Sequence, residues 1–125
     1  MRDSSDWKSQ AATLRFPDKA FIAGKFVPAV DGQTFSSVNP ATGKVLAQVA
    51  ACSAEDVDLA VKAARHAYEK VWSKLPGAER GKYLYRIARI LQERAREFAV
   101  LETLDNGKPI RETRDIDIPL VAAHF

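Results

Sequence analysis

The spacing of apolar residues divides the chain into an early part with a two-residue period and a later part with a helical period. Aromatic and β-branched residues flank Gly24 within residues 21–27, and residues 34–38 and 44–50 have the composition of short strands. Residues 39–43, which contain Pro and Gly, are typical of a loop. The pattern therefore predicts four short strands, the first two joined by a tight turn at Gly24.

The helical period begins after the last of these strands. Ser53 is a favoured N-cap before a helix that ends near Val71. A more regular helix follows a Pro-Gly joint at residues 76–77, and we expect it to break near residues 93–96, because an uninterrupted helix would be long. Its apolar stripe, opposite a charged face, consists of Leu84, Ile87, Ala88, Leu91, Ala95 and Phe98.

Gly107 predicts a sharp helix stop, because glycine adopts the left-handed conformation without a Cβ clash and Pro109 cannot continue a helix. Residues 115–119 predict a new helix start, with an Asp cap and a Pro in the first turn. This helix has no stop signal before Phe125, as expected of a chain truncated within a helix. Residues 1–18 form a polar lead-in, mobile or briefly helical, before a single domain over residues 19–125.

Composition agrees with one ordinary globular domain. The 125 residues are 46% hydrophobic and 28% charged, which argues against disorder. A net charge of +3 is too small to indicate a nucleic-acid or membrane partner. No apolar run is long enough to span a bilayer, and the N-terminus lacks the apolar core of a signal peptide. A single cysteine excludes an internal disulfide framework, so we expect a cytoplasmic protein.

Three residues could carry nucleophilic or acid–base chemistry. Cys52 precedes a predicted helix N-terminus, which can lower a thiol pKa, but a small core or boundary residue is the better interpretation. His66 and His124 lie outside any cluster with zinc-ligand spacing, so surface or packing roles are favoured. Asp115 and Asp117 flank an apolar residue, and helix capping explains them better than metal binding.

Two other features resemble ligand-binding motifs but do not meet the requirements of those motifs. The Gly-Lys pairs at residues 43–44 and 107–108 lack the earlier Gly or the following Ser or Thr of a phosphate-binding loop. They are better interpreted as turn and helix-stop residues. Acidic residues interrupt a basic helix face, which favours a solvated surface over a nucleic-acid interface. That face consists of Lys82, Arg86, Arg89 and Arg96.

An ordered set of motifs resembles the aldehyde dehydrogenase superfamily, N-terminal segment only. Residues 22–26 resemble the family's opening hairpin, and the Asn-Pro-Ala-Thr-Gly run at residues 39–43 resembles its Asn-Pro-x-Thr-Gly loop. The helix from Val57, the Glu-Thr-Leu-Asp-Asn-Gly-Lys-Pro run at residues 102–109 and the Asp-Ile-Asp segment at residues 115–117 follow in the family's order. Each motif alone is weak, but the ordered set is specific.

The resemblance implies an α/β fold. It would be a partial aldehyde dehydrogenase fold, the start of the Rossmann-like NAD(P)-binding domain, with N-terminal β-hairpins followed by covering helices. It also implies oxidation of an aldehyde to a carboxylic acid with NAD or NADP. In the family a Cys thiolate attacks the carbonyl, hydride passes to the nicotinamide, and a Glu-activated water hydrolyses the thioester. None of those catalytic or cofactor-binding positions matches a residue of this chain, and Cys52 matches none of them.

One family site falls within the chain. Many members bind a structural Na⁺ or K⁺ near the strand that leads into the Asn-Pro loop. Carried over, the ligands would be the carbonyl oxygens of Ser37 or Val38 and the carboxylate of Asp105, completed by a further residue elsewhere in the family fold. The alternative is that Asp105 only accepts hydrogen bonds from loop amides.

Two hypotheses follow. The chain is an N-terminal fragment of an aldehyde dehydrogenase, inactive alone, whose full-length parent is a dimer or tetramer. Alternatively, it is a stand-alone helical interaction module that reuses the front of this fold. Both expect helix faces that the chain's own residues leave exposed to solvent, since the covering sheet would be missing.

Overall fold

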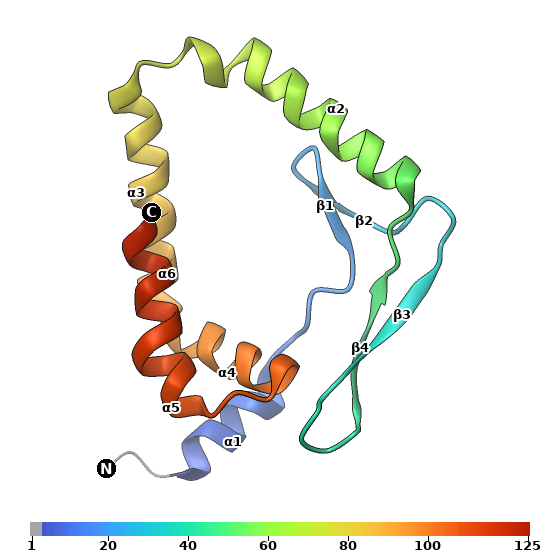
Figure 1. Ribbon diagram of the computed structural model, residues 1–125, viewed down its shortest axis with the longest axis vertical. Helices are drawn as coiled ribbons and strands as arrows, with labels where there is room; N and C mark the ends of the chain where they lie inside the picture. The colour runs from blue at the N-terminus through green and yellow to red at the C-terminus, as the bar shows by residue number, and fades with distance from the viewer. Residues whose placement is uncertain (1–3) are drawn as a thin grey trace.

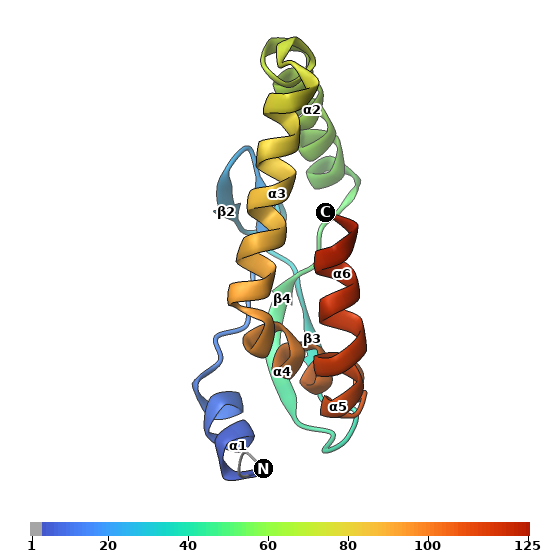
Figure 2. The same cartoon turned by 90° about the vertical axis from the view of Figure 1, so that its left-hand side faces the viewer.

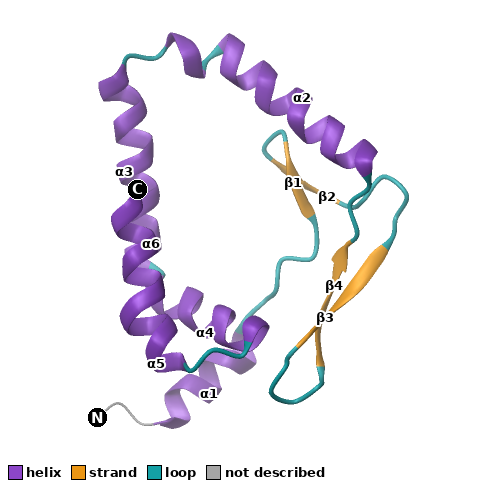
Figure 3. Ribbon diagram, viewed as in Figure 1, coloured by secondary structure: helices purple, strands orange, loops and turns teal. Residues whose placement is uncertain are grey.

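A computed structural model describes residues 4–125, whose elements follow one another around a flat open ring (Figures 1 and 2). Helices and strands segregate, with both hairpins on one side of the ring (Figure 3). In chain order the elements are α1 (Ser4–Thr13), β1 (Ala20–Ile22), β2 (Lys25–Val27), β3 (Thr34–Val38), β4 (Val45–Ala50), α2 (Ala54–Lys70), the 3₁₀ turn η1 (Trp72–Lys74), α3 (Gly77–Glu93), α4 (Ala95–Asn106), α5 (Ile110–Glu112), the π-helical turn η2 (Thr113–Asp117) and α6 (Ile118–His124).

The first hairpin confirms the predicted tight turn. β1 and β2 pair antiparallel with Phe21 opposite Phe26, and the two rings lie 5.1 Å apart between centroids. Both turn residues have positive φ, 52° at Ala23 and 79° at Gly24. Positive φ at both central residues gives the turn a twist that matches the twist of the strands.

The second hairpin pairs β3 with β4 and contains an irregularity. Ser37 lies opposite Ala47, whereas Val38 lies opposite Val45, so Leu46 has no partner across the ladder. An unpaired residue of this kind bends the strand and increases its twist. The bulge therefore bends β4 close to the point where this strand leaves the Asn-Pro loop.

A buried carboxylate anchors the start of α2. Asp56 is 2% exposed. Its Oδ2 accepts hydrogen bonds from the backbone N–H of Ser53 at 2.8 Å and from the Ser53 hydroxyl at 3.1 Å. Its Oδ1 accepts from the backbone N–H of Val30 at 2.9 Å. One side chain thus closes a capping box and ties the helix to the loop before β3.

The helices pack around a small core. α3 ends at Glu93 and α4 begins at Ala95, which confirms the predicted break. The Thr113 hydroxyl, fully buried, donates to the carbonyl of Ala99 at 3.1 Å and lies 3.0 Å from the Thr103 hydroxyl oxygen. Most of the buried apolar residues of the helices are small. They are Ala88, Ala99, Val100, Ile118 and Ala122.

The predicted helix start at residues 115–119 is confirmed in part: α6 begins at Ile118 with Pro119 in its first turn, but the predicted Asp cap is wrong. The backbone is already helical from Ile110, directly after Pro109, and Asp117 has helical angles instead of those of a cap. Between α5 and Ile118 the helix widens into the π-helical turn η2, which spans Thr113–Asp117 and so contains the residue four before Pro119. A proline ring clashes with the carbonyl four residues earlier, and a widened turn accommodates it, so Pro119 sits inside the helical run.

Large apolar side chains stay exposed, as both sequence hypotheses expect. Of the predicted stripe on the regular helix, Ala88 is buried but Leu84 and Ile87 are about two-fifths exposed, at 40% and 41%. The chain exposes 9272 Å² of surface, whereas a compact monomer of this mass exposes roughly 6,600 Å². The helices therefore present apolar faces that their own chain does not cover.

We predict that Asp56→Ala loosens the start of α2, because it leaves the N–H groups of Ser53 and Val30 without their acceptor. Hydrogen exchange at these two amides should speed up roughly fivefold, the size typical of a lost helix cap. Glu55→Ala, an exposed change in the same turn, is the control and should leave both amides protected. Equal exchange in the two variants would contradict this role.

The same contacts predict a pH dependence. The backbone hydrogen bond from Ser53, and then that from Val30, hold the pKa of Asp56 below its ordinary value of 3.8. The stabilisation is therefore complete above this ordinary value, which applies to the unfolded chain, and is lost as pH falls through the lower folded-state pKa. Asp56→Ala should lack this component of the acid transition, as followed by circular dichroism.

Candidate functional site

The loop between β3 and β4 meets the end of α4, although the two segments lie far apart in the sequence. The Ser37 hydroxyl donates a hydrogen bond to Asp105 Oδ1 at 2.7 Å, across 68 residues of chain. Close beside it, a Cβ added to Gly107 would lie 2.9 Å from Cγ of Pro40. Two motifs that the sequence shows separately therefore form one junction.

The Asn-Pro loop is folded by its own hydrogen bonds. Asn39 is buried, and its Oδ1 accepts from the backbone N–H of Ala41 at 2.9 Å. The Asn39 carbonyl accepts from the N–H of Gly43 at 2.8 Å, where φ is 68°. Asn favours this kind of side-chain turn, and Gly tolerates the positive φ that closes it. The loop thus presents Pro40 in a fixed position.

The end of α4 is fixed just as closely. Gly107 has φ of 82°, and its N–H bonds the carbonyl of Thr103 at 3.0 Å, which confirms the predicted helix stop. Lys108 Nζ lies 2.6 Å from Asp117 Oδ2 and 3.7 Å from Glu102 Oε1. The hydrogen bond to Asp117 is the main reason that the pKa of Lys108 is raised. α4 is thereby tied to the helical segment after it.

A cleft of about 490 Å³ opens over this junction. Its wall is largely apolar, with Phe16 before β1 and Phe35, Val38 and Val49 on the second hairpin. The polar lining comes from Ser37 and Asp105. An exposed carboxylate beside a hydroxyl, in an otherwise apolar cleft, offers hard oxygen donors to a cation.

The structure brings two residues of the expected cation site into contact, through the Ser37 hydroxyl and not through the carbonyl oxygen that the family resemblance implies. Ser37 and Asp105 share a hydrogen bond, and Val38 follows Ser37 at the point where the bulge interrupts pairing. The Ser37 hydroxyl donates to Oδ1 of Asp105, and Oδ2 of the same carboxylate is a further oxygen acceptor. One carboxylate with neutral oxygens matches a weakly held, hard cation in donor type. In residues 4–125, no three His, Cys, Asp or Glu side chains gather as a metal cluster.

The other sequence candidates lie apart from the junction. Cys52 is exposed between β4 and α2, which agrees with the boundary position of the prediction and excludes the core position. His66 is exposed on α2, and His124 lies 2.7 Å from the carbonyl of Leu120 through Nδ1.

Both aspartates near the C-terminal helix form ion pairs instead of caps. Asp115 accepts two hydrogen bonds from Arg114, which lowers the pKa of the carboxyl, and Asp117 pairs with Lys108. The capping interpretation is therefore wrong. Asp117 directly precedes α6, but it has helical backbone angles and makes no side-chain cap hydrogen bond, because the backbone is already helical from Ile110.

The basic helix face is largely neutralised. Lys82 pairs with Glu79 at 2.7 Å, and Arg89 lies 3.9 Å from Glu93. Arg96 lies 2.7 Å from Asp6, and its guanidinium stacks over the Trp7 ring at 3.6 Å from the centroid. The arginine thus attaches α1 to α4.

Sequence reasoning missed three contacts of this framework. Asp56 has a recognisable signal, the Ser-x-x-Asp spacing of a capping box at residues 53–56. The Thr103–Thr113 pair and the Pro40–Gly107 contact join residues whose separations follow no helical or strand period, so no pattern marks them.

Among residues 4–125, no helix is both long and apolar enough to cross a membrane.

Comparison with known proteins gives one family. The aldehyde dehydrogenase family model matches residues 26–125. An aminoacetaldehyde dehydrogenase from Pseudomonas aeruginosa is 52% identical over 115 residues, which are 91% of this chain and 23% of the relative. A mitochondrial aldehyde dehydrogenase from Leishmania tarentolae is 49% identical over 109 residues, 86% of this chain and 22% of the relative.

Comparison with solved structures gives the same family. A γ-glutamyl-γ-aminobutyraldehyde dehydrogenase from Burkholderia cenocepacia has a TM-score of 0.92 at 43% identity, over 95% of this chain and 24% of its own. The P. syringae indole-3-acetaldehyde dehydrogenase AldA, solved with NAD⁺, has a TM-score of 0.91 at 42% identity. The match covers 94% of this chain and 24% of the AldA chain. The chain thus spans about a quarter of the length of the relatives that it matches.

We predict that Gly107→Ala destabilises the junction. The left-handed conformation costs a residue with a Cβ about 1–2 kcal/mol, and the new Cβ would also meet Pro40. The control is Gly81→Ala in α3, where an added Cβ meets open space and should stabilise the helix by about 0.5–1 kcal/mol. Urea midpoints that shift in opposite directions would support the assignment, and a shift in the same direction would contradict it.

Proposed function

The chain belongs to the aldehyde dehydrogenase family, and on that premise we propose that it forms the N-terminal part of an enzyme that oxidises an aldehyde to a carboxylic acid with NAD(P)⁺. The match over residues 26–125 carries this proposal, supported by a TM-score above 0.9 to a relative solved with NAD⁺. We assign residues 19–125 to the first part of the NAD(P)-binding domain and residues 1–18 to a lead-in. The parent would be a cytoplasmic dimer or tetramer.

Within that enzyme this chain supplies scaffold. Its polar side chains tie segments together, as Asp56 ties α2 to Val30 and Ser37 ties β3 to Asp105. The thiolate, the carboxylate that activates water and the oxyanion donors would come from the rest of the family fold. The 125-residue chain alone is accordingly expected to be inactive.

We also propose that the junction holds a monovalent cation, Na⁺ or K⁺. The Asp105 carboxylate and carbonyl oxygens of Ser37 or Val38 would bind it, and another residue of the family fold would complete the shell. The hydrogen bond between Ser37 and Asp105 supports this, because it holds the donors together before a cation binds. The cation would fasten the second hairpin to the end of α4.

The alternative, a stand-alone helical interaction module, shares one observation with the main proposal. Its exposed apolar faces are present, for example at Tyr83 and Leu84 of α3. Such faces fit either an enzyme segment or a binding module, so activity in the context of a whole enzyme has to separate the two.

The test is a chimera that joins this chain, in place of the matched N-terminal segment, to the rest of the P. aeruginosa aminoacetaldehyde dehydrogenase. We expect NAD⁺ reduction in the presence of aldehyde, within about an order of magnitude of the parent enzyme's rate, because 52% identity preserves most contacts. The 125-residue chain alone should show no NAD⁺ reduction. A folded but inactive chimera, or an active isolated chain, would contradict the proposal.

For the cation, we predict that the chimera melts a few degrees higher in NaCl or KCl than in choline chloride of equal ionic strength, since a ligand that binds the folded state stabilises it. Asp105→Asn should abolish this difference. Asp58→Asn, which removes an exposed carboxylate that pairs with Lys62, is the matched control and should retain it. A difference that persists in Asp105→Asn would exclude the site.

A further inference from the structure

The helix α1 lies outside the segment that the family model matches, but it packs against α4, which lies inside that segment (Figure 1). Arg96 in the first turn of α4 makes the contact. Its Nη2 lies 2.7 Å from Asp6 Oδ2, and its guanidinium stacks on the Trp7 ring. The Arg96 side chain is only 27% exposed, so most of it is covered. Residues that precede the family segment therefore have a defined position on it.

The contact extends along one face of α4 toward Gly107. Arg96, Val100 and Leu104 recur every four residues, which places them on the same face of the helix. A cleft of about 220 Å³ lies between this face and α1 and also reaches the first residue of α5. α1 thus borders both helical segments that meet at Gly107. The apolar lining of the cleft consists of Trp7 and Ala11 of α1, Val100 and Leu104 of α4, and Ile110 of α5.

The end of α4 that α1 borders is the end that carries the junction. Leu104 directly precedes Asp105, which accepts the hydrogen bond from Ser37. The N–H of Gly107 closes the helix with its bond to the carbonyl of Thr103. Because the last turn of a helix frays easily, an element packed along it limits that fraying. Packing of α1 therefore bears on the position of the Asp105 carboxylate.

The contact between α1 and α4 has features of one that opens readily. Arg96 Nη2 lies close to Asp6 without the geometry of a hydrogen bond. Within residues 4–125, the buried Gln10 Oε1 also has no hydrogen-bond partner. Buried polar atoms without partners disfavour the closed state. The Asp6 side chain is 54% exposed, so dissolved salt screens its attraction to the arginine.

We propose that α1 (residues 4–13) is a strap, held by Arg96, that keeps the last turns of α4 in the position where Asp105 meets Ser37. When the ion pair to Asp6 is screened, the strap opens and the end of α4 frays. The inference gives a positioning role to residues that precede the family match, which begins at residue 26. It depends on contacts within this chain and is independent of the activity of a whole enzyme.

The first measurement reports whether the strap is closed. Trp72→Phe leaves Trp7 as the only tryptophan and keeps an aromatic ring beside Tyr83, so acrylamide quenching of the fluorescence measures the exposure of Trp7. In this background we expect Arg96→Met, which keeps an unbranched side chain but removes the charge, to raise the quenching constant about twofold. Arg89→Met, which removes an exposed positive charge from α3, is the matched control and should leave the quenching constant unchanged.

Ionic strength tests the same opening without a substitution at the contact. Raising choline chloride to about 0.5 M, where the screening length is a few ångströms, should increase the quenching of Trp7 when Arg96 is present. The increase should be absent in Arg96→Met, because the ion pair is already lost. An equal increase in both chains would overturn the screening of this pair as the cause of opening.

The second measurement reports the positioning role. We expect Arg96→Met and Trp7→Ala each to speed hydrogen exchange at the Gly107 amide roughly fivefold, the size typical of an exposed ion pair together with a cation–π contact. Arg89→Met should leave this amide unchanged. Trp7→Ala alters α1 alone, so its effect cannot come from a changed helix propensity within α4. Circular dichroism checks that each variant keeps its helix content.

The double variant and two outcomes decide the matter. Trp7→Ala combined with Arg96→Met should exchange no faster at Gly107 than either single variant, because both open the same contact. Faster exchange in Arg96→Met but not in Trp7→Ala would overturn the strap, because the arginine would then act within α4. Unchanged exchange at Gly107 in variants whose Trp7 is freely quenched would overturn the positioning role.

Discussion

The contact between the Asn-Pro loop and the end of α4 closes the ring of elements. Pro40 lies where only a glycine at position 107 leaves room, and the Ser37 hydroxyl bonds Asp105 within the same junction. Closing so long a stretch of chain costs conformational entropy, which short-range helix and turn contacts cannot repay. The junction is therefore the constraint on which the relative placement of the hairpins and the later helices depends.

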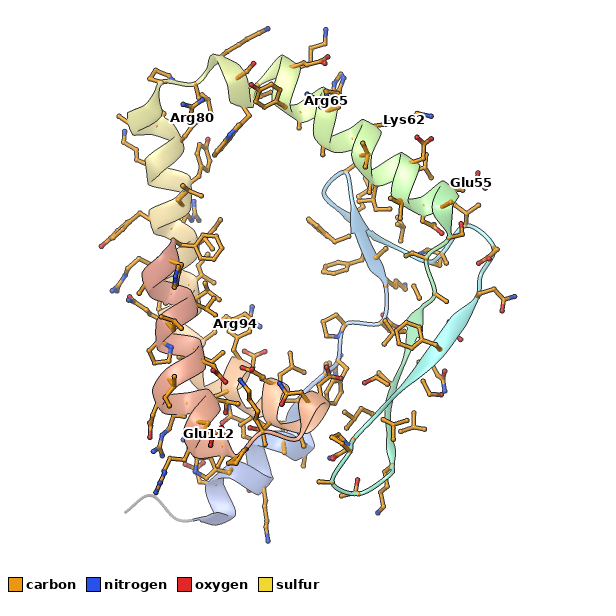
Figure 4. The ribbon with its side chains drawn as sticks, viewed as in Figure 1. Glu55, Lys62, Arg65, Arg80, Arg94 and Glu112 are labelled. Carbon is orange, nitrogen blue, oxygen red and sulfur yellow. The ribbon has the colours of Figure 1, made fainter. Side chains whose placement is uncertain are left out.

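Asp56 extends this constraint to α2. Its carboxylate holds the helix start against Val30 and so fixes which side of α2 is turned outward. With Glu55, Lys62 and Arg65 on the outer side of α2 (Figure 4), the apolar residues of the helix have to face away from them. The same polar contacts that fasten the scaffold thus determine where its uncovered apolar surface lies, and they engage the carboxylates of Asp56 and Asp105 and the hydroxyl of Ser37 in hydrogen bonds.

Much of the candidate site follows from local sequence, but its assembly does not. The loop at residues 39–43 and the stop at Gly107 are each predictable, since Asn, Pro and Gly impose particular backbone angles on their neighbours. Ser37, Val38 and Asp105 entered through family resemblance, and the structure brings Ser37 and Asp105 together. The closeness of Pro40 to Gly107 has no counterpart in any periodic pattern.

The amino-acid sequence alone specifies four features: the strands, the cap at Ser53, the helix break near Arg94 and the family. Each of them depends on residues a few positions apart. Packing in three dimensions set the rest: the burial of Asp56 and Thr113, the ion pairs of Asp115 and Asp117, and the helical run that continues through Pro119. Those features depend on contacts between distant segments, and their free energy is absent from any short stretch of chain. The same reason explains why an apolar stripe predicts a buried face but cannot tell which residues will bury it.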